Sequence, residues 1–166
     1  MAFAIFILWV IFNIFYMSDV RFNTIERRKS AFLEHYNQGK DITEIANLLE
    51  IEVHHSNKLP DKTLGAIQYD DENKKFQMII NVKNKIDTIT SKSRVLMTVA
   101  HEVAHWIYDY DDMTKNGEVF CETESLNISD KRELIASVVA SNIMLGINEP
   151  LVDEKTLFED NGKREN

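Results

Sequence analysis

The chain has 166 residues, enough for one domain with a hydrophobic core of its own. Its formal net charge is −8, and the acidic residues are spread along the chain, so direct binding to the phosphate backbone of a nucleic acid is not predicted. The single cysteine, Cys121, cannot form an internal disulfide, which fits a reducing compartment.

The N-terminal segment, residues 1–17, reads MAFAIFILWVIFNIFYM and carries no charge. It is shorter than the ~20 apolar residues that a helix needs to cross a bilayer, and it lacks the basic start and cleavage site of a signal peptide. Two interpretations stay open, a membrane anchor and a start codon assigned too far upstream. As an anchor it would keep the following domain in the cytoplasm, because basic residues flank its C-terminal side: Arg21, Arg27, Arg28 and Lys29. Both interpretations predict a cytoplasmic location, either free or tethered to the membrane.

Helical spacing of apolar residues predicts a helix within residues 23–38 that ends at Gly39, and a second helix over 42–50 capped by Asp41. Residues 51–55, IEVHH, predict a short strand. Residues 64–82, LGAIQYDDENKKFQMIINV, predict a β-hairpin around the polar turn DDENKK.

Ser91 or Ser93 is the predicted cap of a longer helix that runs to about Tyr110. Residues 111–127 read as a polar, acidic connection. Ser129 or Asp130 then caps a last apolar helix that ends at Gly146. The sequence thus predicts a single α+β domain over residues 18–160, between the hydrophobic segment 1–17 and a disordered polar tail, 161–166.

The motif His101-Glu102-Val103-Ala104-His105 lies in the middle of the long predicted helix. Residues four apart share a helix face, so both imidazoles can bind one ion, and Glu102 lies beside the position that a catalytic zinc leaves for water. The alternative is two unrelated histidines, one exposed and one hydrogen-bonded in the core. The apolar neighbours favour a Zn²⁺ site, because two imidazoles and a carboxylate are costly to bury without a shared partner.

The third ligand stays open on sequence grounds. Asp111 follows the helix without a glycine to turn the chain back, and Cys121 is an uncommon partner for two histidines. Three glutamates lie in the acidic connection, where nothing fixes their direction: Glu118, Glu122 and Glu124.

Glu133 is a further candidate, in the first turn of the last helix, where a rigid element can hold a ligand. The same residue can form a capping box with Asp130, three positions earlier. Spacing alone does not decide between the two roles.

Residues from about 40 to 150 resemble the ImmA/IrrE family of zinc metallopeptidases. The resemblance is carried by LGAIQYD and MIINV in the hairpin, by RVLMTVAHEVAH from Arg94 to His105, and by ELIASVVASNIMLG in the last helix. The chain departs from the family pattern at Gly146, where proline is usual, in its hydrophobic N-terminus, and in the missing C-terminal extension of larger members.

The resemblance implies a small zincin-like α+β domain, with a short antiparallel hairpin packed on the helix of the histidine motif. It places the zinc ligands at His101, His105 and Glu133, with Glu102 as the general base. It further implies an endopeptidase whose protein substrate is a helix-turn-helix repressor of a mobile element or a stress response.

Zinc endopeptidases commonly hold their substrate along a strand edge, which residues 76–82 or 64–69 are predicted to supply. Tyr69 is a candidate to polarise the scissile carbonyl, although strand propensity alone also explains it. The other histidines, His35, His54 and His55, are predicted to be surface or strand residues. A non-catalytic binding protein on the same scaffold is the alternative function, and an intact Glu102 argues against it.

Overall fold

The computed structural model describes residues 22–83, 89–123 and 130–153. The predictions for the segment 1–17 and for the tail 161–166 lie outside the described residues. Among the helices within those ranges, none is long and apolar enough to cross a membrane.

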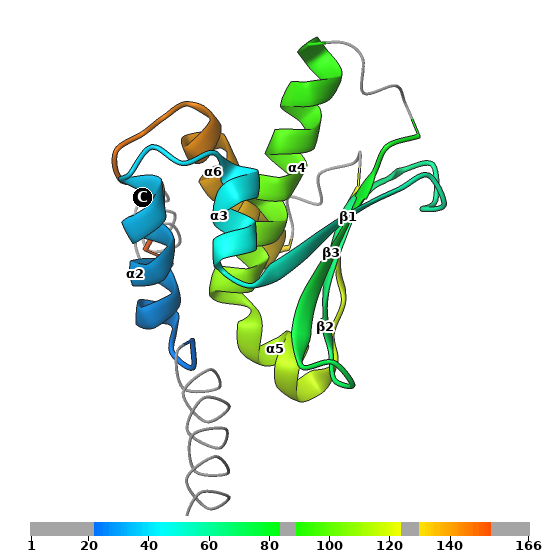
Figure 1. The fold of residues 1–166 in the computed structure, drawn as a ribbon, viewed down its shortest axis with the longest axis horizontal. Coiled ribbons are helices and arrows are strands. Elements are labelled where there is room, and N and C mark those ends of the chain that lie inside the picture. Colours follow the sequence, from blue (N-terminus) through cyan, green and yellow to red (C-terminus); the bar gives the residue numbers. More distant parts are fainter. Residues whose placement is uncertain (1–21, 84–88, 124–129, 154–166) are drawn as a thin grey trace, which may run out of the picture.

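The domain is α+β, with five helices and a mixed four-stranded sheet in the described part of the chain. Figure 1 shows the helices gathered on one side of the sheet, with α4 at the centre. The elements, labelled as in Figure 1, are α2 (Ile25–Tyr36), α3 (Ile42–Leu48), β1 (Ile51–Ser56), β2 (Thr63–Asp70), β3 (Lys75–Asn81), α4 (Ile89–Tyr108), α5 (Tyr110–Asn116), β4 (Phe120–Thr123) and α6 (Lys131–Met144).

Local signals place most of the helix ends. The Asp41 side chain accepts hydrogen bonds from the amides of Thr43 and Glu44 at 2.9 and 3.0 Å, which confirms it as the cap of α3. Asp130 caps α6 by accepting from the amide of Arg132 at 3.0 Å. Gly146 follows α6 with a φ of 67°, a conformation that glycine adopts without steric cost.

The strand order is β1-β3-β2-β4. The predicted hairpin is confirmed, since β2 pairs antiparallel with β3, and β1 pairs parallel with β3. Both hairpin strands are therefore interior, and within the described residues the edges of the sheet are β1 and β4. The prediction that residues 64–69 or 76–82 supply a free strand edge is wrong, because each of these strands already has a neighbour on both sides.

Two further predictions need correction. The connection over residues 111–127 contains the helix α5 and the strand β4. Helix α4 begins at Ile89, so Ser91 and Ser93 lie inside the helix and do not cap it, and it ends at Tyr108.

Helix α4 packs against the sheet on one face and against α3 and α6 on others, and the exposed residues among those described, 92–94, lie near its N-terminus. Its segment from Val99 to Ile107 is buried throughout, and the Trp106 ring packs edge-on against Phe22 at 5.0 Å between centroids. Polar groups placed on this part of the helix are therefore withdrawn from water.

Candidate metal centre

Helix α4 carries His101, Glu102 and His105 into the interior of the domain. Their exposed fractions are 2%, 0% and 0%, so all three side chains are among the buried polar groups of the protein. A buried polar group needs a partner to offset its lost hydration, and for the two histidines one such partner comes from α6.

The imidazoles of His101 and His105 converge with the carboxylate of Glu133 at the start of α6. The two Nε2 atoms lie 3.1 Å apart, Glu133 Oε2 lies 3.2 Å from His101 Nε2, and Glu133 Oε1 lies 3.4 Å from His105 Nε2. The residues form a group that can hold a metal ion.

These distances match a tetrahedral ion. Zinc bonds of about 2.0–2.2 Å separate neighbouring ligand atoms by roughly 3.3–3.6 Å in a tetrahedral site. The observed separations of 3.1 to 3.4 Å lie within a few tenths of an ångström of that range. Three converging acceptor atoms also repel each other unless a cation or a proton lies between them, so the donor set fits a metal ion.

Both oxygens of Glu133 face the imidazoles, an arrangement expected of a ligand. The Asp130 cap of α6 is made through the amide of Arg132. Glu133 is thus held in the first turn of a rigid helix that packs along α4.

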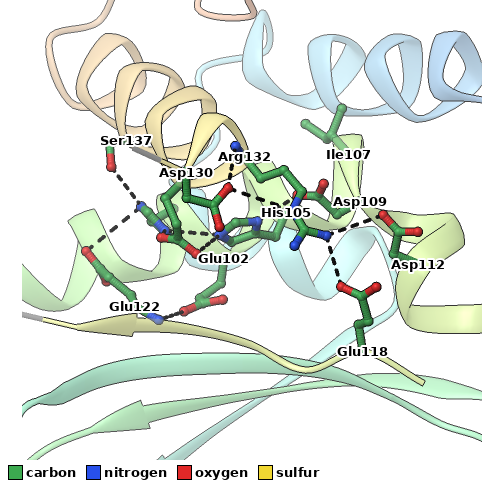
Figure 2. Close-up of polar contacts among 12 residues, drawn as sticks. Glu102, His105, Ile107, Asp109, Asp112, Glu118, Glu122, Asp130, Arg132 and Ser137 are labelled. Atoms are coloured by element: carbon green, nitrogen blue, oxygen red, sulfur yellow. Dashed lines mark hydrogen bonds and ion pairs between the residues drawn. The ribbon is translucent and has the colours of Figure 1, made fainter. Parts of the chain in front are cut away.

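Of the other third-ligand candidates in the described residues, Glu122 lies nearest, with its Oε1 4.0 Å from His101 Nδ1 rather than from the Nε2 atom that faces Glu133. The remaining candidates lie outside this cluster. Asp111 pairs with Lys115 at 3.1 Å on the surface of α5, and Glu118 pairs with Arg132 at 2.9 Å (Figure 2). Cys121 is exposed on β4, and Glu124 lies outside the described residues.

Glu102 lies beside the cluster, on the side of the sheet. Its Oε1 accepts a hydrogen bond of 3.4 Å from the amide of Glu122, whereas its buried Oε2 has no hydrogen-bond partner among the described residues (Figure 2). Burial raises the pKa of the Glu102 carboxyl to about 8, against the opposing charge of His105. An unpaired buried oxygen next to three converging ligand atoms is the arrangement that a general base for a water molecule requires.

Gly65 on β2 makes room for this carboxylate. A Cβ atom at position 65 would lie 2.5 Å from Thr98 Cγ2 and 3.1 Å from Glu102 Oε1. The pairing of β2 with β4 shifts register between Thr63 and Gly65, opposite Glu122. The strand pairing is therefore irregular at the point where the amide of Glu122 donates a hydrogen bond to Glu102 Oε1.

Asp109 orients the His105 ring through Nδ1, the nitrogen that does not face the cluster. Its Oδ2 lies 2.7 Å from His105 Nδ1, which leaves Nε2 facing the cluster (Figure 2). The Phe120 ring stacks on the same imidazole at 4.6 Å. Sequence reasoning missed Asp109, although its place four residues after His105 is the spacing that relates the two histidines.

In the metal-free protein the cluster binds protons. Burial alone would lower the pKa of His105, but its contacts with Asp109 and Glu133 raise it to about 9. Burial alone would raise the pKa of Glu133, but the two imidazoles hold it at about 2. At neutral pH a proton on His105 therefore offsets the negative charge of Glu133.

We expect the Asp109→Ala variant to bind zinc about 10- to 100-fold more weakly, because the ring of His105 loses the partner that fixes its orientation. Competition with a chromophoric chelator measures this affinity. The matched control is Asp111→Ala, an exposed aspartate two positions along that pairs with Lys115. Equal zinc affinities for the two variants would contradict this role for Asp109.

The metal-free protein is expected to lose stability as the pH rises from 6.5 to 9. The pKa of His105 is raised from 6.5 to about 9, so its contribution is complete below pH 6.5 and is lost by about pH 9. The raised pKa of Glu102 acts in the same direction between pH 4.5 and about 8. A shift of this size corresponds to on the order of 3 kcal/mol.

Thermal unfolding measures the effect, at pH 6.5, 8 and 9 for the metal-free protein and at pH 6.5 and 8 for the zinc-loaded protein. A bound metal displaces these protons, so the zinc-loaded protein is expected to be no less stable at pH 8 than at pH 6.5. A metal-free protein whose melting temperature rises over this range would contradict the expectation.

Tyr69 does not lie with the cluster. Its ring packs on Phe76 at 5.0 Å, and it follows Gly65 by four residues, roughly 13 Å along a strand at ~3.3 Å per residue. The remaining histidines are also elsewhere, with His54 and His55 exposed on β1 and His35 half-buried on α2.

Comparisons of the chain with protein-family models, with curated proteins and with solved structures give no match. The case for a metal centre therefore rests on the sequence motif and on the geometry of the cluster.

Proposed function

We propose that this protein is a zinc-dependent endopeptidase, with His101, His105 and Glu133 as metal ligands and Glu102 as general base. The observation that carries the proposal is the convergence of two imidazole nitrogens with the two oxygens of one carboxylate, in contacts of 3.1 to 3.4 Å, beside a buried carboxylate of which one oxygen has no partner among the described residues. Two imidazoles and one carboxylate, with a position left for water, form a ligand set typical of catalytic zinc.

When bound, zinc polarises a carbonyl group as a Lewis acid and lowers the pKa of water to ~7. The residues of the chain supply the proton transfers. Glu102 accepts a proton from the attacking water at its free oxygen and later donates it to the leaving amine. A divalent ion nearby favours the ionised form of Glu102, which a general base requires and which the metal-free protein holds only above pH ~8.

We further propose that β4 is the substrate-binding edge, in place of the two strands predicted from the sequence. It is the edge strand beside the cluster, since the Phe120 ring stacks on His105 and the amide of Glu122 contacts Glu102. A peptide added to this edge by main-chain hydrogen bonds would run past the metal ligands.

The resemblance to the ImmA/IrrE family supports a zincin-like classification and a substrate class. On that basis we propose that the substrate is a regulatory protein, specifically a helix-turn-helix repressor. The acidic character of the chain, −8 overall, favours a basic partner such as a DNA-binding protein.

Mass-spectrometric mapping of new protein N-termini tests the proposed function. The zinc-loaded wild-type chain is incubated with candidate helix-turn-helix repressors and with a proteome digest, in parallel with a chelated sample. New N-termini that depend on zinc are expected in the repressor sample. Identical N-termini in the zinc-loaded and chelated samples would argue against peptide hydrolysis.

A further inference from the structure

The two histidines of the cluster are held unequally. His105 Nδ1 has a close carboxylate partner, Asp109, at 2.7 Å. His101 Nδ1 has the hydroxyl of Ser137 at 3.5 Å and Glu122 Oε1 at 4.0 Å, both at or beyond the limit of a hydrogen bond. The orientation of His101 is therefore set less tightly than that of His105.

Glu122 projects from β4 toward the cluster. It shares a strand face with Phe120, whose ring stacks on His105, and its side chain is 15% exposed. Its Oε2 is buried and has no hydrogen-bond partner among the described residues. A buried carboxylate next to the carboxyl group of Glu102 is costly unless a donor or a cation offsets it.

The backbone of Glu122 has a second contact with the site. Its amide donates to Glu102 Oε1 at 3.4 Å, and Figure 2 shows Glu122 approaching from β4 while Ser137 approaches from α6. One residue of the edge strand thus lies against both a proposed ligand and the proposed general base.

We propose that Glu122 is a positioning residue, whose carboxylate accepts the Nδ1 proton of His101 when the metal ion is bound and so ties that ligand to the edge strand β4. This inference rests on the proposed metal centre. Glu122 is a stronger acceptor than Ser137, because a carboxylate forms a charge-assisted hydrogen bond and a hydroxyl does not. In the metal-bound protein this hydrogen bond also gives the Glu122 carboxylate a side-chain donor, whereas in the metal-free protein its buried Oε2 has none among the described residues.

Zinc affinity measured by chelator competition on the full chain tests the proposal, with Glu122→Leu and Glu122→Gln as the informative pair. Leucine removes the acceptor at similar volume, and the expected loss of affinity is tenfold or more. Glutamine keeps an acceptor oxygen, so its expected loss is within about threefold. Ser137→Ala is expected to stay within about threefold of wild type, and Glu52→Gln on the opposite edge strand is expected to bind as wild type does.

Thermal unfolding of the metal-free variants separates positioning from a structural role. Glu122→Leu removes an unpaired buried charge, so its metal-free form is expected to be at least as stable as the wild type. Cobalt-loaded Glu122→Leu is expected to show an altered visible spectrum, because the orientation of one ligand changes.

Three results would overturn the proposal. The first is that Glu122→Leu binds zinc as tightly as the wild type. The second is that Ser137→Ala loses zinc affinity and Glu122→Leu does not. The third is that the metal-free Glu122→Leu protein fails to fold. A wild-type chain that binds no zinc would overturn the proposed function itself, and this inference with it. If the wild type binds zinc and Glu122→Leu binds it with the same affinity, only the role of Glu122 is overturned.

Discussion

Replacing Glu102 with Gln is expected to lower the rate of peptide hydrolysis by about 10²–10⁴-fold while leaving zinc bound. Glutamine has the shape of glutamate but cannot accept the proton of the attacking water. Glu102 is fully buried, and one of its oxygens has no hydrogen-bond partner among the described residues, so the loss of proton acceptance is the main change at the site. The measurement is the rate of zinc-dependent cleavage, with the zinc content determined on the same samples.

The matched control for this variant is Glu118→Gln, a partly exposed glutamate that pairs with Arg132 outside the cluster. It is expected to cleave as fast as the wild type. If the Glu102→Gln variant cleaved as fast as the wild type, Glu102 would not be the general base. A non-catalytic binding protein on this scaffold would instead show no cleavage with either residue at position 102.

The second large effect is expected on metal affinity. The His105→Gln variant should bind zinc at least about 100-fold more weakly than the wild type, because removal of a ligand costs more than removal of its hydrogen-bond partner. His105 is 0% exposed, so glutamine is chosen to fill the volume of the ring. Chelator competition gives the affinity, and circular dichroism confirms that the variant is folded.

His54→Gln provides the control, since His54 is an exposed histidine on the far edge strand β1. Its zinc affinity is expected to equal that of the wild type. If His54→Gln lost as much affinity as His105→Gln, zinc would bind at surface histidines and the cluster would not be the site.

The sequence predicted several features from local signals. The apolar residues around His101 and His105 predict the burial of α4, and the alternation in residues 64–82 predicts the hairpin. Asp41 and Asp130 act as caps because each side chain lies within reach of amides two or three residues later.

Helix α5 and the contact of Asp109 with His105 are local features that were missed, whereas the other missed features depend on contacts between distant residues. β4 has four residues and a single apolar anchor, Phe120, so its strand character comes from pairing with β2. The identity of the free sheet edges follows from the strand order, which hydrophobic patterns do not encode. For Glu133, the spacing fits a capping box as well as a ligand, and only the packing of α6 along α4 brings its carboxylate to the histidines.

Zinc content per chain, measured on the purified wild type and on Glu133→Ala, tests the metal centre most directly. The control is Glu26→Ala, an exposed glutamate that, like Glu133, lies in the first turn of its helix. One zinc per chain is expected in the wild type and in Glu26→Ala, with a clear loss in a folded Glu133→Ala protein. A folded wild type without zinc, or full zinc retention in Glu133→Ala, would contradict a centre built from His101, His105 and Glu133.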